Sequence, residues 1–382
     1  VAKLSGQDIK ASGQIASIAQ LMARTERFPV KLAFEGFGLQ ADTDLMVSLV
    51  EDRPSATGTI NIPEVIMAAE GSGESAGGTS EASGGKVFPD TPLPWDTLST
   101  GNGDVKISVG KLVLSNGMEI RDIVVPVKLS GSKLAADPIS LAVADGTIRA
   151  GLGMNAADKS VSLRADIDGF SAENVAKAMK KTDLITDGPV DLSLNVRGSG
   201  DTVSAVMANL NGSLVGGMGQ SRVRSDALNI LGADVIMQVV SVMNPLGNKD
   251  PYTVAQCAVV NFQISNGVAR TEDGIAFVTD KMQFTSSGQI NLGTERVDLG
   301  VRSKASSGLG VGIGDLVQAV KISGPLSDPG VGIDKVGAAK TIGTIGAAIA
   351  TGGISALLQG AKNRVDTSGN DPCADARTWH TK

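Results

Sequence analysis

Apolar and polar residues alternate along most of the chain, which predicts many β-strands with one apolar face each. The pattern is most regular between residues 103 and 170, where turns such as Asp145-Gly146 separate the apolar runs. The apolar positions of these runs are Val105, Ile107 and Val109; Ile123, Val125, Val127 and Leu129; Ile139, Leu141 and Val143; Ile148, Ala150, Leu152 and Met154; and Val161, Leu163, Ala165 and Ile167. They predict an up-and-down antiparallel meander with one apolar and one polar face.

Similar alternation predicts further strands on both sides of this region. We expect strands over residues 28–34, 57–62, 188–196 and 257–264. A hairpin is expected over 288–301, with a turn at Thr294-Glu295-Arg296, and short strands follow at 320–322 and 331–333.

A possible internal repeat links two of these strands. Pro29-Val30 and Pro189-Val190 stand 189 − 29 = 160 residues apart, and each opens an alternating strand. We interpret this as a degenerate repeat of a short helix, a Pro-Val strand and following strands, which would extend along one axis.

Apolar residues at helical spacing predict a few helices between the strands. Short helices are expected over residues 12–27 and 171–182, and a stronger one over 225–244, which Pro245 ends. The last would be a buried core helix or would cover an apolar surface, with direct membrane contact as the alternative. Residues 341–360 are uncharged, but Gly, Ala, Ser and Thr dominate them. We therefore expect an irregular helix that packs on the sheet or lies at an interface rather than a spanning one.

The amino-acid composition limits both the type of fold and the classes of partner. The chain has 48 Gly but only 8 Phe, 2 Trp and 1 Tyr, so aliphatic residues supply the apolar mass, as suits short strands and turns. The net charge of −6 and the scattered Lys and Arg argue against nucleic acid as a partner. Residues 71–85 contain only Gly, Ser, Ala, Glu and Thr, which predicts a flexible linker.

The sequence contains only weak matches to motifs of catalytic or phosphate-binding sites. Gly73-Glu-Ser-Ala-Gly77 matches a nucleophile elbow formally, but it lacks a flanking strand and helix, and the single histidine is His380 in the tail. The glycine run at 308–314 lacks the Lys-Ser/Thr pair of a phosphate loop. Asp166 and Asp168 would share a strand face, and we expect them to be solvated rather than an acid–base pair. No catalytic residue, metal or cofactor is therefore expected.

Three motifs carry a family resemblance. They are Phe88-Pro-Asp-Thr-Pro-Leu-Pro-Trp95, the hairpin from Gly288 to Val301, and Ile322-Ser-Gly-Pro-Leu-Ser-Asp-Pro329. In this order they resemble the C-terminal conserved region of the AsmA family, over roughly residues 88–373. The resemblance implies a bacterial envelope protein with an N-terminal transmembrane helix and a long periplasmic β-rich body. It also implies a role in outer-membrane biogenesis and in bridge-like lipid transfer through an apolar β-groove.

The resemblance also organises the chain. Residues 1–70 would end an upstream β-groove repeat with a short helix, 71–100 would be a Gly/Ser/Pro-rich linker, 101–335 the AsmA-like C-terminal β-groove region, and 336–382 a small-residue helical segment and polar tail. No charged-then-apolar leader follows Val1, so a soluble cytosolic protein is one interpretation. The resemblance favours a periplasmic fragment of a protein that is anchored in the inner membrane by a segment preceding Val1.

The expected fold is mainly β: an elongated antiparallel meander curled into an apolar groove, with a few short helices and a helical C-terminal segment. A one-layer meander hides its apolar face by closing on itself, by helices that cover it, or by forming a trough for acyl chains. The resemblance favours the trough and non-enzymatic phospholipid transport between the inner and outer membranes. The candidate groove residues are Val105, Ile107, Val109, Ile123, Val125, Val127, Ile139, Leu141, Val143, Val161 and Leu163.

Two alternatives remain at this point. The chain could be an assembly factor or scaffold that binds strands of outer-membrane proteins at its sheet edges, or a closed structural β-domain. The two cysteines are also ambiguous: one buried and one exposed thiol would suit the cytosol. The resemblance instead implies a Cys257–Cys373 disulfide, because disulfides persist in the periplasm.

Overall fold

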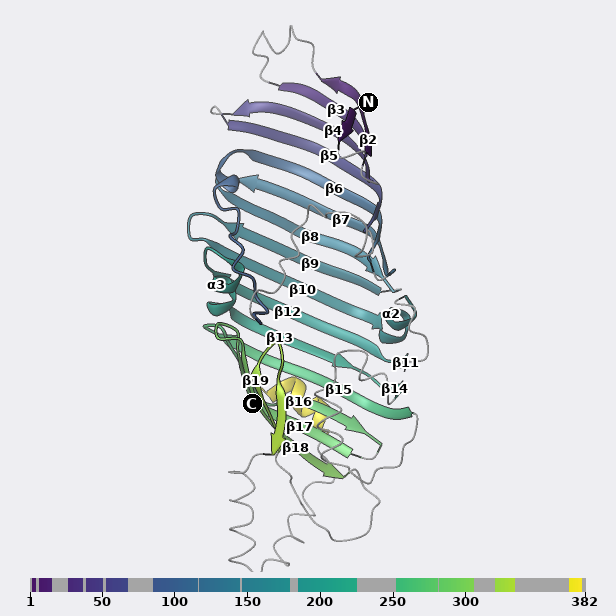
Figure 1. Ribbon diagram of the computed structural model, residues 1–382, viewed down its shortest axis with the longest axis vertical. Helices are drawn as coiled ribbons and strands as arrows, with labels where there is room; N and C mark the ends of the chain where they lie inside the picture. Colours follow the sequence, from purple (N-terminus) through teal and green to yellow (C-terminus); the bar gives the residue numbers. More distant parts are fainter. Residues whose placement is uncertain are drawn as a thin grey trace, which may run out of the picture. The chain divides into compact units, whose positions relative to one another are not determined.

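The described residues of the chain are mainly β-strand with a few short helices (Figure 1). The computed structural model describes residues 2–4, 7–15, 27–36, 39–50, 53–67, 85–115, 117–144, 146–178, 185–224, 252–280, 282–305, 320–333 and 371–379. They confirm the predicted fold class of mainly antiparallel strands with a helix near the C-terminus. The chain divides into two compact units: unit 1 is Val1–Glu81, Phe88–Asp183 and Val190–Gly212, and unit 2 is Ala82–Val87, Leu184–Pro189 and Ser213–Lys382.

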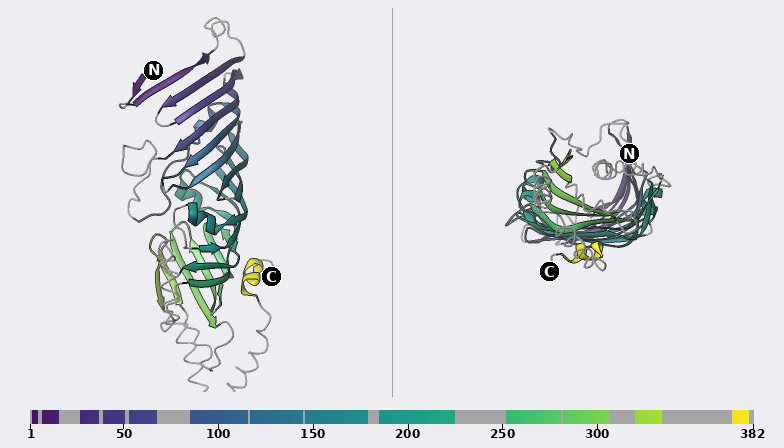
Figure 2. Two further views of the ribbon diagram at one scale, coloured as in Figure 1. Left: turned by 90° about the vertical axis from the view of Figure 1, so that its right-hand side faces the viewer. Right: turned by 90° about the horizontal axis from the view of Figure 1, so that it is seen from below.

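Unit 1 is built on a single layer of strands (Figure 2). Its strands are β1 (Ala2–Leu4), β2 (Gln7–Ile15), β3 (Arg27–Gly36), β4 (Leu39–Val50), β5 (Arg53–Ile66), β6 (Asn102–Val113), β7 (Glu119–Ser130), β8 (Lys133–Val143), β9 (Gly146–Asn155), β10 (Ser160–Ser171) and β12 (Pro189–Ser199). Its helices are the 3₁₀-helix η1 (Thr97–Ser99), α2 (Ala172–Ala178) and α3 (Val203–Ala208), and Figure 1 shows α2 and α3 at the ends of strands.

One strand pair of unit 1 differs from its neighbours. Strands β1 to β5 and strands β6 to β10 pair antiparallel in chain order, but β5 and β6 run parallel, with Ile60 opposite Ile107. Parallel neighbours need a long connection between them, because the chain must return to the starting end of the sheet. Residues 67–101 make this return. Most of the predicted linker at 71–85 lies outside the described residues, so its susceptibility to protease stays a prediction.

Unit 2 is a second antiparallel meander. Its strands are β11 (Ile185–Asp187), β13 (Asn211–Met218, which begins at the boundary of the units), β14 (Ser221–Arg224), β15 (Tyr252–Ser265), β16 (Val268–Thr279), β17 (Met282–Asn291), β18 (Arg296–Ala305), β19 (Val320–Pro325) and β20 (Gly330–Ile333). Strands β14 to β20 pair antiparallel in chain order, and β11 pairs with β14. The predicted hairpin at 288–301 is confirmed as β17–β18, with Ile290 opposite Val297.

Two hydrophobic clusters stabilise unit 2. Helix α8 (Pro372–Thr378) packs on β15 and β16, and Figure 2 shows it in yellow against one side of these strands. The cluster below it contains Val259, Ala276, Val278, Cys373 and Ala376. The second cluster contains Phe284, Val301 and Val320, with Phe277, Ile322 and Val331 packed against them. Unit 2 therefore buries apolar side chains from most of its long strands.

A close approach between strands requires glycine at several positions, for example at Gly58 in unit 1 and Gly288 in unit 2. Gly58 in β5 has φ +141°, and a Cβ there would lie 2.1 Å from the Asp44 carbonyl oxygen of β4. Gly288 in β17 has φ +145°, and its Cβ would lie 2.2 Å from the Asp298 carbonyl oxygen of β18. Only glycine adopts this backbone without strain, and such positions commonly bend a sheet.

The structure contradicts one of the predicted helices, confirms another and does not describe the remaining two. The helix expected from Ser12 is wrong over residues 12–15, which belong to β2 and pair with β3; the rest of it lies outside the described residues. The helix expected at 171–182 is confirmed over Ala172–Ala178 as α2, and residues 179–182 lie outside the described residues. The Ser171 hydroxyl, at the end of β10, accepts a hydrogen bond from the Asn174 N–H at 3.1 Å. The segments at 225–244 and 341–360 lie outside the described residues. Among the helices that are described, none combines the length and hydropathy needed to span a bilayer.

Candidate functional site: the apolar face of unit 1

The strand register places the predicted groove residues of β6 and β7 on one face. Three directly opposed pairs show this: Val105 with Val127, Ile107 with Val125, and Val109 with Ile123. Residues directly opposite each other in a ladder project to the same side of the sheet.

The same face continues over β8, β9 and β10. Leu141 is opposite Ile148, Leu152 is opposite Leu163, and Met154 is opposite Val161. Ile139 and Val143 alternate with Leu141 on β8. Val124 of β7 is opposite Ser140 of β8 on the polar face of the sheet. The next residue of each strand, Val125 and Ile139, therefore projects to the same face as Ile107 and Leu141. The register therefore brings all eleven predicted groove residues to one face, which we call the apolar face. Their role in lipid binding stays a prediction.

The apolar face extends further than the sequence analysis proposed. Ile60 and Ile62 of β5 stand opposite Ile107 and Val109 of β6. Through β4 the face continues to β3, where Val30 is opposite Leu45. The alternation of strand 28–34 was visible in the sequence, but its connection to this face depends on the parallel β5–β6 register, for which the sequence carries no signal.

Most side chains of the apolar face remain partly accessible to solvent. Among the eleven predicted residues only Val143 is buried, at 6% exposure, and Leu163 is 37% exposed. Leu32 on β3 is 36% exposed. A soluble monomer rarely leaves a contiguous aliphatic surface of several strands accessible unless that surface binds something.

The opposite face of the same strands is polar. Cross-strand ion pairs join Lys31 to Asp44 at 3.0 Å and Lys128 to Asp104 at 3.6 Å. Asp166 accepts a hydrogen bond from the Ser193 hydroxyl at 2.9 Å and is exposed, as is Asp168. Exposed pairs of this kind contribute little stability. The two aspartates are therefore surface groups rather than an acid–base pair.

Residues 88–101, which we call the strap, pack along one end of the strands. The Leu93 N–H donates to the Asp201 carbonyl oxygen at 2.9 Å, and the Trp95 indole N–H donates to the Gly200 carbonyl oxygen at 3.1 Å. Trp95 and Leu98 are 7% and 5% exposed. The sequence analysis treated these residues as the end of a linker, whereas here they are an ordered part of unit 1.

The strap and the turns beneath it form a continuous hydrogen-bonded rim, which we call the strap rim. The Ser99 and Ser132 hydroxyl oxygens are 3.0 Å apart, and the Ala156 N–H donates to the Ser132 carbonyl oxygen at 3.0 Å. The Gly200 N–H donates to the Lys159 carbonyl oxygen, also at 3.0 Å. The turns after β7, β9 and β12 are therefore tied to one another and to the strap.

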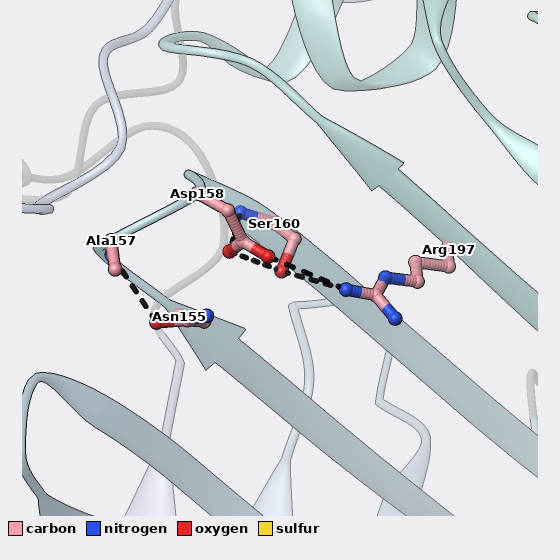
Figure 3. Close-up of polar contacts among 5 residues, drawn as sticks. All are labelled: Asn155, Ala157, Asp158, Ser160 and Arg197. Atoms are coloured by element: carbon pink, nitrogen blue, oxygen red, sulfur yellow. Dashed lines mark hydrogen bonds and ion pairs between the residues drawn. The ribbon is translucent and has the colours of Figure 1, made fainter.

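The turn between β9 and β10 is fixed by its own side chains (Figure 3). The Asn155 side-chain oxygen accepts the Ala157 N–H at 3.2 Å, and Asp158 accepts the Ser160 hydroxyl at 2.7 Å. Arg197 reaches Asp158 from β12 at 3.5 Å. Hydrogen bonds from the Ser160 hydroxyl and the Ser160 N–H, and after them the Arg197 charge, hold the pKa of the Asp158 carboxyl below its usual value. These contacts order the turn, and none of the groups is arranged for a chemical step.

The other end of β5 and β6, which we call the open rim, has a different surface. Ile66 and Met67 are 61% and 51% exposed, and the Met67 N–H donates to the Val113 carbonyl oxygen at 2.9 Å. Close by, Arg121 pairs with Glu119 at 2.7 Å and, by its hydrogen bond and charge, holds the pKa of that carboxyl below its usual value. Large apolar side chains thus stand in solvent at this rim, whereas those at the strap rim are covered.

The residues that could hold a metal are otherwise engaged. Among the described residues, potential ligands gather at Cys257, Asp371 and Cys373. The two sulfur atoms form the disulfide that the resemblance implied, with the Cα atoms 6.5 Å apart. Asp371 caps α8, because its Oδ1 accepts the N–H groups of Cys373 and Ala374 at 2.9 and 3.3 Å. This group is therefore structural.

The sequence analysis expected a helical segment near the C-terminus but placed Cys373 in the polar tail after it, so the position of α8 was not predicted. Besides the disulfide, the Asn261 side-chain amide donates to the carbonyl oxygens of Ala376 and Arg377 at 3.1 and 2.9 Å. The Trp379 indole N–H donates to the Asn261 carbonyl oxygen at 3.1 Å. A capping Asp followed by Pro was the available signal for the start of this helix.

The fold and the apolar face define a class of β-rich proteins that present an extended aliphatic sheet surface. The profile described as "AsmA family" matches residues 59–274, more than half of the chain, so the chain belongs to the AsmA family. The AsmA family protein YhjG of Escherichia coli (strain K12) is 26% identical over 347 residues, which cover 83% of this chain and 48% of that protein. The chain thus spans about half the length of this curated relative.

Membership of this family confirms the resemblance seen in the sequence. No solved structure matches the chain. AsmA family proteins are bacterial envelope proteins and are not known as enzymes, so the membership indicates an envelope-related function.

Proposed function

We propose that this chain is a periplasmic part of an envelope protein and that its apolar face carries phospholipid acyl chains between the inner and outer membranes. In the full-length protein an inner-membrane anchor would hold it in place. The observation that carries the proposal is the collection of eleven aliphatic side chains on one partly accessible sheet face of unit 1. Membership of the AsmA family supports the envelope setting.

The geometry of the face suits passive movement of a hydrocarbon chain. Ile60, Ile107 and Val125 are consecutive members of one row that crosses the strands. Neighbouring strands lie ~4.8 Å apart, so an acyl chain along this row meets aliphatic side chains at short, regular intervals. Apolar contact is non-directional and stabilises by ~25 cal/mol per Å² of buried surface, so a displacement along the row exchanges equivalent contacts. Head groups would remain in water.

Loss of the apolar surface should abolish this binding. An aspartate introduced at Ile107, Val125 or Leu141 would place a charge under the acyl chain, which is unfavourable without a partner. We expect the Ile107→Asp protein to be purified with much less bound phospholipid, measured by native mass spectrometry. Ser108→Asp is the matched control, because it adds the same charge to the neighbouring residue on the polar face.

Photo-crosslinking tests the assignment of the face directly. A crosslinker at Ile107 should capture phospholipid, and one at Lys106, Ser108 or Lys128 should not. Crosslinks only from these polar-face positions would reverse the assignment. Protein that carries no lipid but captures unfolded outer-membrane proteins would favour the alternative of an assembly factor that binds client strands at its sheet edges.

A further inference from the structure

Three rows of side chains cross the apolar face of unit 1, and the strand pairing allows each row to be followed from strand to strand. The first row is Val30, Leu45, Gly58, Val105, Val127, Ala136, Leu152 and Leu163; the central row is Leu32, Thr43, Ile60, Ile107, Val125, Ile139, Ala150 and Ala165; and the last row is Ile62, Val109, Ile123, Leu141, Ile148 and Ile167. Only Thr43 among them has a polar side chain, and its hydroxyl is already hydrogen-bonded to the Leu32 backbone, 3.2 Å from the nitrogen and 3.3 Å from the oxygen. The rows therefore present hydrocarbon to a ligand, and all of their residues except Ala136 are at least partly accessible.

Polar groups limit these rows on both sides. Two residues beyond the last row, Glu64 of β5 forms an ion pair with Lys111 of β6. On the other side lies the strap rim, and the row next to it has only Ala56 and Gly103 where it crosses β5 and β6. A hydrocarbon chain that stays in contact with large apolar side chains is therefore confined to the first, central and last rows.

The spacing of the side chains decides the direction in which such a chain lies. Along a row, neighbouring strands bring side chains to within ~4.8 Å of each other, whereas along a strand the next residue of the same face is ~6.8 Å away. Carbon atoms in contact are ~3.5–4.0 Å apart, so the side chains of one row touch, and an interval remains between two rows. An acyl chain laid across the strands, between two rows, contacts both rows over its whole length. A chain laid along a strand would cross one interval after another.

We propose that the apolar face takes a two-chain phospholipid whose acyl chains lie side by side across the strands, one on each side of the central row. Three rows leave two intervals, and on β6 these are bounded by Val105, Ile107 and Val109. A single-chain lipid would cover one interval and leave the apolar side chains along the other in water. This inference rests on the proposed lipid-binding function and adds to it the class of lipid and the direction of its chains.

Pairs of photo-crosslinkers test both the number and the direction of the chains. Val105 and Leu152 share the first row and are separated by three strand spacings, ~14 Å. Val105 and Val109 lie on one strand, on the two sides of the central row, and are also ~14 Å apart. An acyl chain that spans one membrane leaflet is ~15 Å long, so a single chain links either pair only if it lies in the direction of that pair.

The probes are phosphatidylglycerol and its single-chain lyso form with the same acyl chain, each added to the full chain, and mass spectrometry counts the crosslinks that each lipid molecule makes. We expect the lyso form to link Val105 with Leu152 through one molecule and not to link Val105 with Val109. The two-chain lipid should link both pairs. Crosslinkers at Asp104 and Ser108 are the matched control, because they have the spacing of Val105 and Val109 on the polar face, and they should capture neither lipid.

Each other outcome contradicts a defined part of the proposal. A lyso molecule that links Val105 with Val109 would show a chain lying along the strand, and a two-chain lipid that fails to link them would show that one interval is empty. Either result would overturn the arrangement and leave lipid binding intact, whereas no capture at Val105 with either lipid would overturn the proposed function as well. Circular dichroism identifies a variant that does not fold, and Val127 and Ile123 then replace Val105 and Val109, because they stand opposite them on β7.

Discussion

The two units build similar meanders but treat their apolar side chains in opposite ways. In unit 2, Phe284, Val301 and Val320 are 8%, 6% and 0% exposed and form one cluster across neighbouring strands. In unit 1, Ile107, Val125 and Leu141 occupy equally regular positions but are only half-buried. The same period-two sequence pattern therefore produces a packed core in one unit and an accessible surface in the other.

The difference separates stability from binding. A side chain buried in a core contributes apolar transfer free energy and packing, and its removal leaves a cavity. A half-buried side chain on an accessible face contributes less to folding and remains available to a ligand. Unit 2 has the features of a stable folded core, and unit 1 has those of a binding surface. Each unit contains one of the two tryptophans, Trp95 or Trp379, so fluorescence of single-tryptophan variants follows each unit separately.

The largest contrast is expected for matched phenylalanine truncations. Phe284→Ala should lower the free energy of unfolding of unit 2 by ~3–5 kcal/mol, because it removes a buried ring that stacks on Phe277 with the centroids 6.0 Å apart. Phe34→Ala on the half-buried face of unit 1 should cost ~1 kcal/mol. Urea unfolding checks both, and equal losses would remove the distinction between the units.

The disulfide should stabilise unit 2 alone. The double variant Cys257→Ser/Cys373→Ser should lose ~2–4 kcal/mol, because the bond closes a loop of 116 residue steps and holds α8 over Val259 and Ala276. Hydrogen exchange should become faster in β15 and β16 and remain the same in β6 and β7. A reductant should reproduce the effect in the wild type and add nothing in the variant. Faster exchange in β6 would show that the two units are coupled.

The two tryptophans permit a comparison of smaller effects. Each indole N–H donates to a backbone carbonyl oxygen at 3.1 Å, Trp95 to Gly200 and Trp379 to Asn261. Trp95→Phe should destabilise unit 1 by ~1–2 kcal/mol, because a largely buried carbonyl loses its partner, and Trp379→Phe should do the same in unit 2. In each variant, the fluorescence of the remaining tryptophan follows thermal unfolding of the other unit. We expect the melting temperature of that other unit to be unchanged.

The smallest expected effect is a loss of folding stability of unit 2 at acidic pH. Burial alone would raise the pKa of Asp273, but hydrogen bonds from Ser287 and Arg302 and the Arg302 charge hold it below its usual value of 3.8. A depressed carboxyl pKa stabilises the folded state above the unfolded-state pKa, and this stability is lost as the pH falls through the folded-state pKa. We expect a loss of at most ~1 kcal/mol below pH ~4, since the pair is largely exposed. Asp273→Asn should abolish this acid dependence in unit 2. An unchanged pH profile would contradict the assignment.

Local patterns were predicted from sequence where one face of a strand differs strongly from the other. The runs from Val105 to Ile167 met this condition, so the strands and the shared face followed from alternation alone. The error at Ser12 has the opposite cause. Ile9, Ala11, Gly13 and Ile15 alternate in β2, but small residues weaken that signal, and the helical spacing of Ile15 with Ile18 outweighed it.

Long-range pairing explains what the sequence could not show. The strap binds residues 200–204, more than a hundred positions away, through backbone groups that every residue possesses. The parallel β5–β6 register likewise depends on the return path of the chain rather than on any local motif. Both features determine where the apolar face ends. Its residues on β6–β10 could be predicted from the sequence. Its continuation through β5 and the difference between its two rims could not.

The Cys257–Cys373 bond also determines how the chain would carry tension. A pull between residues 1 and 382 follows the covalent path through residue 257, across the two sulfur atoms, and on from residue 373. Strands β16 to β20 lie within the closed ring and are outside this path. Such a pull would therefore load the strands that precede Cys257 in both units, while the hairpins of β16–β20 would stay outside the path until the bond was reduced. Pulling with optical tweezers should show 116 residue steps of additional contour length only after reduction.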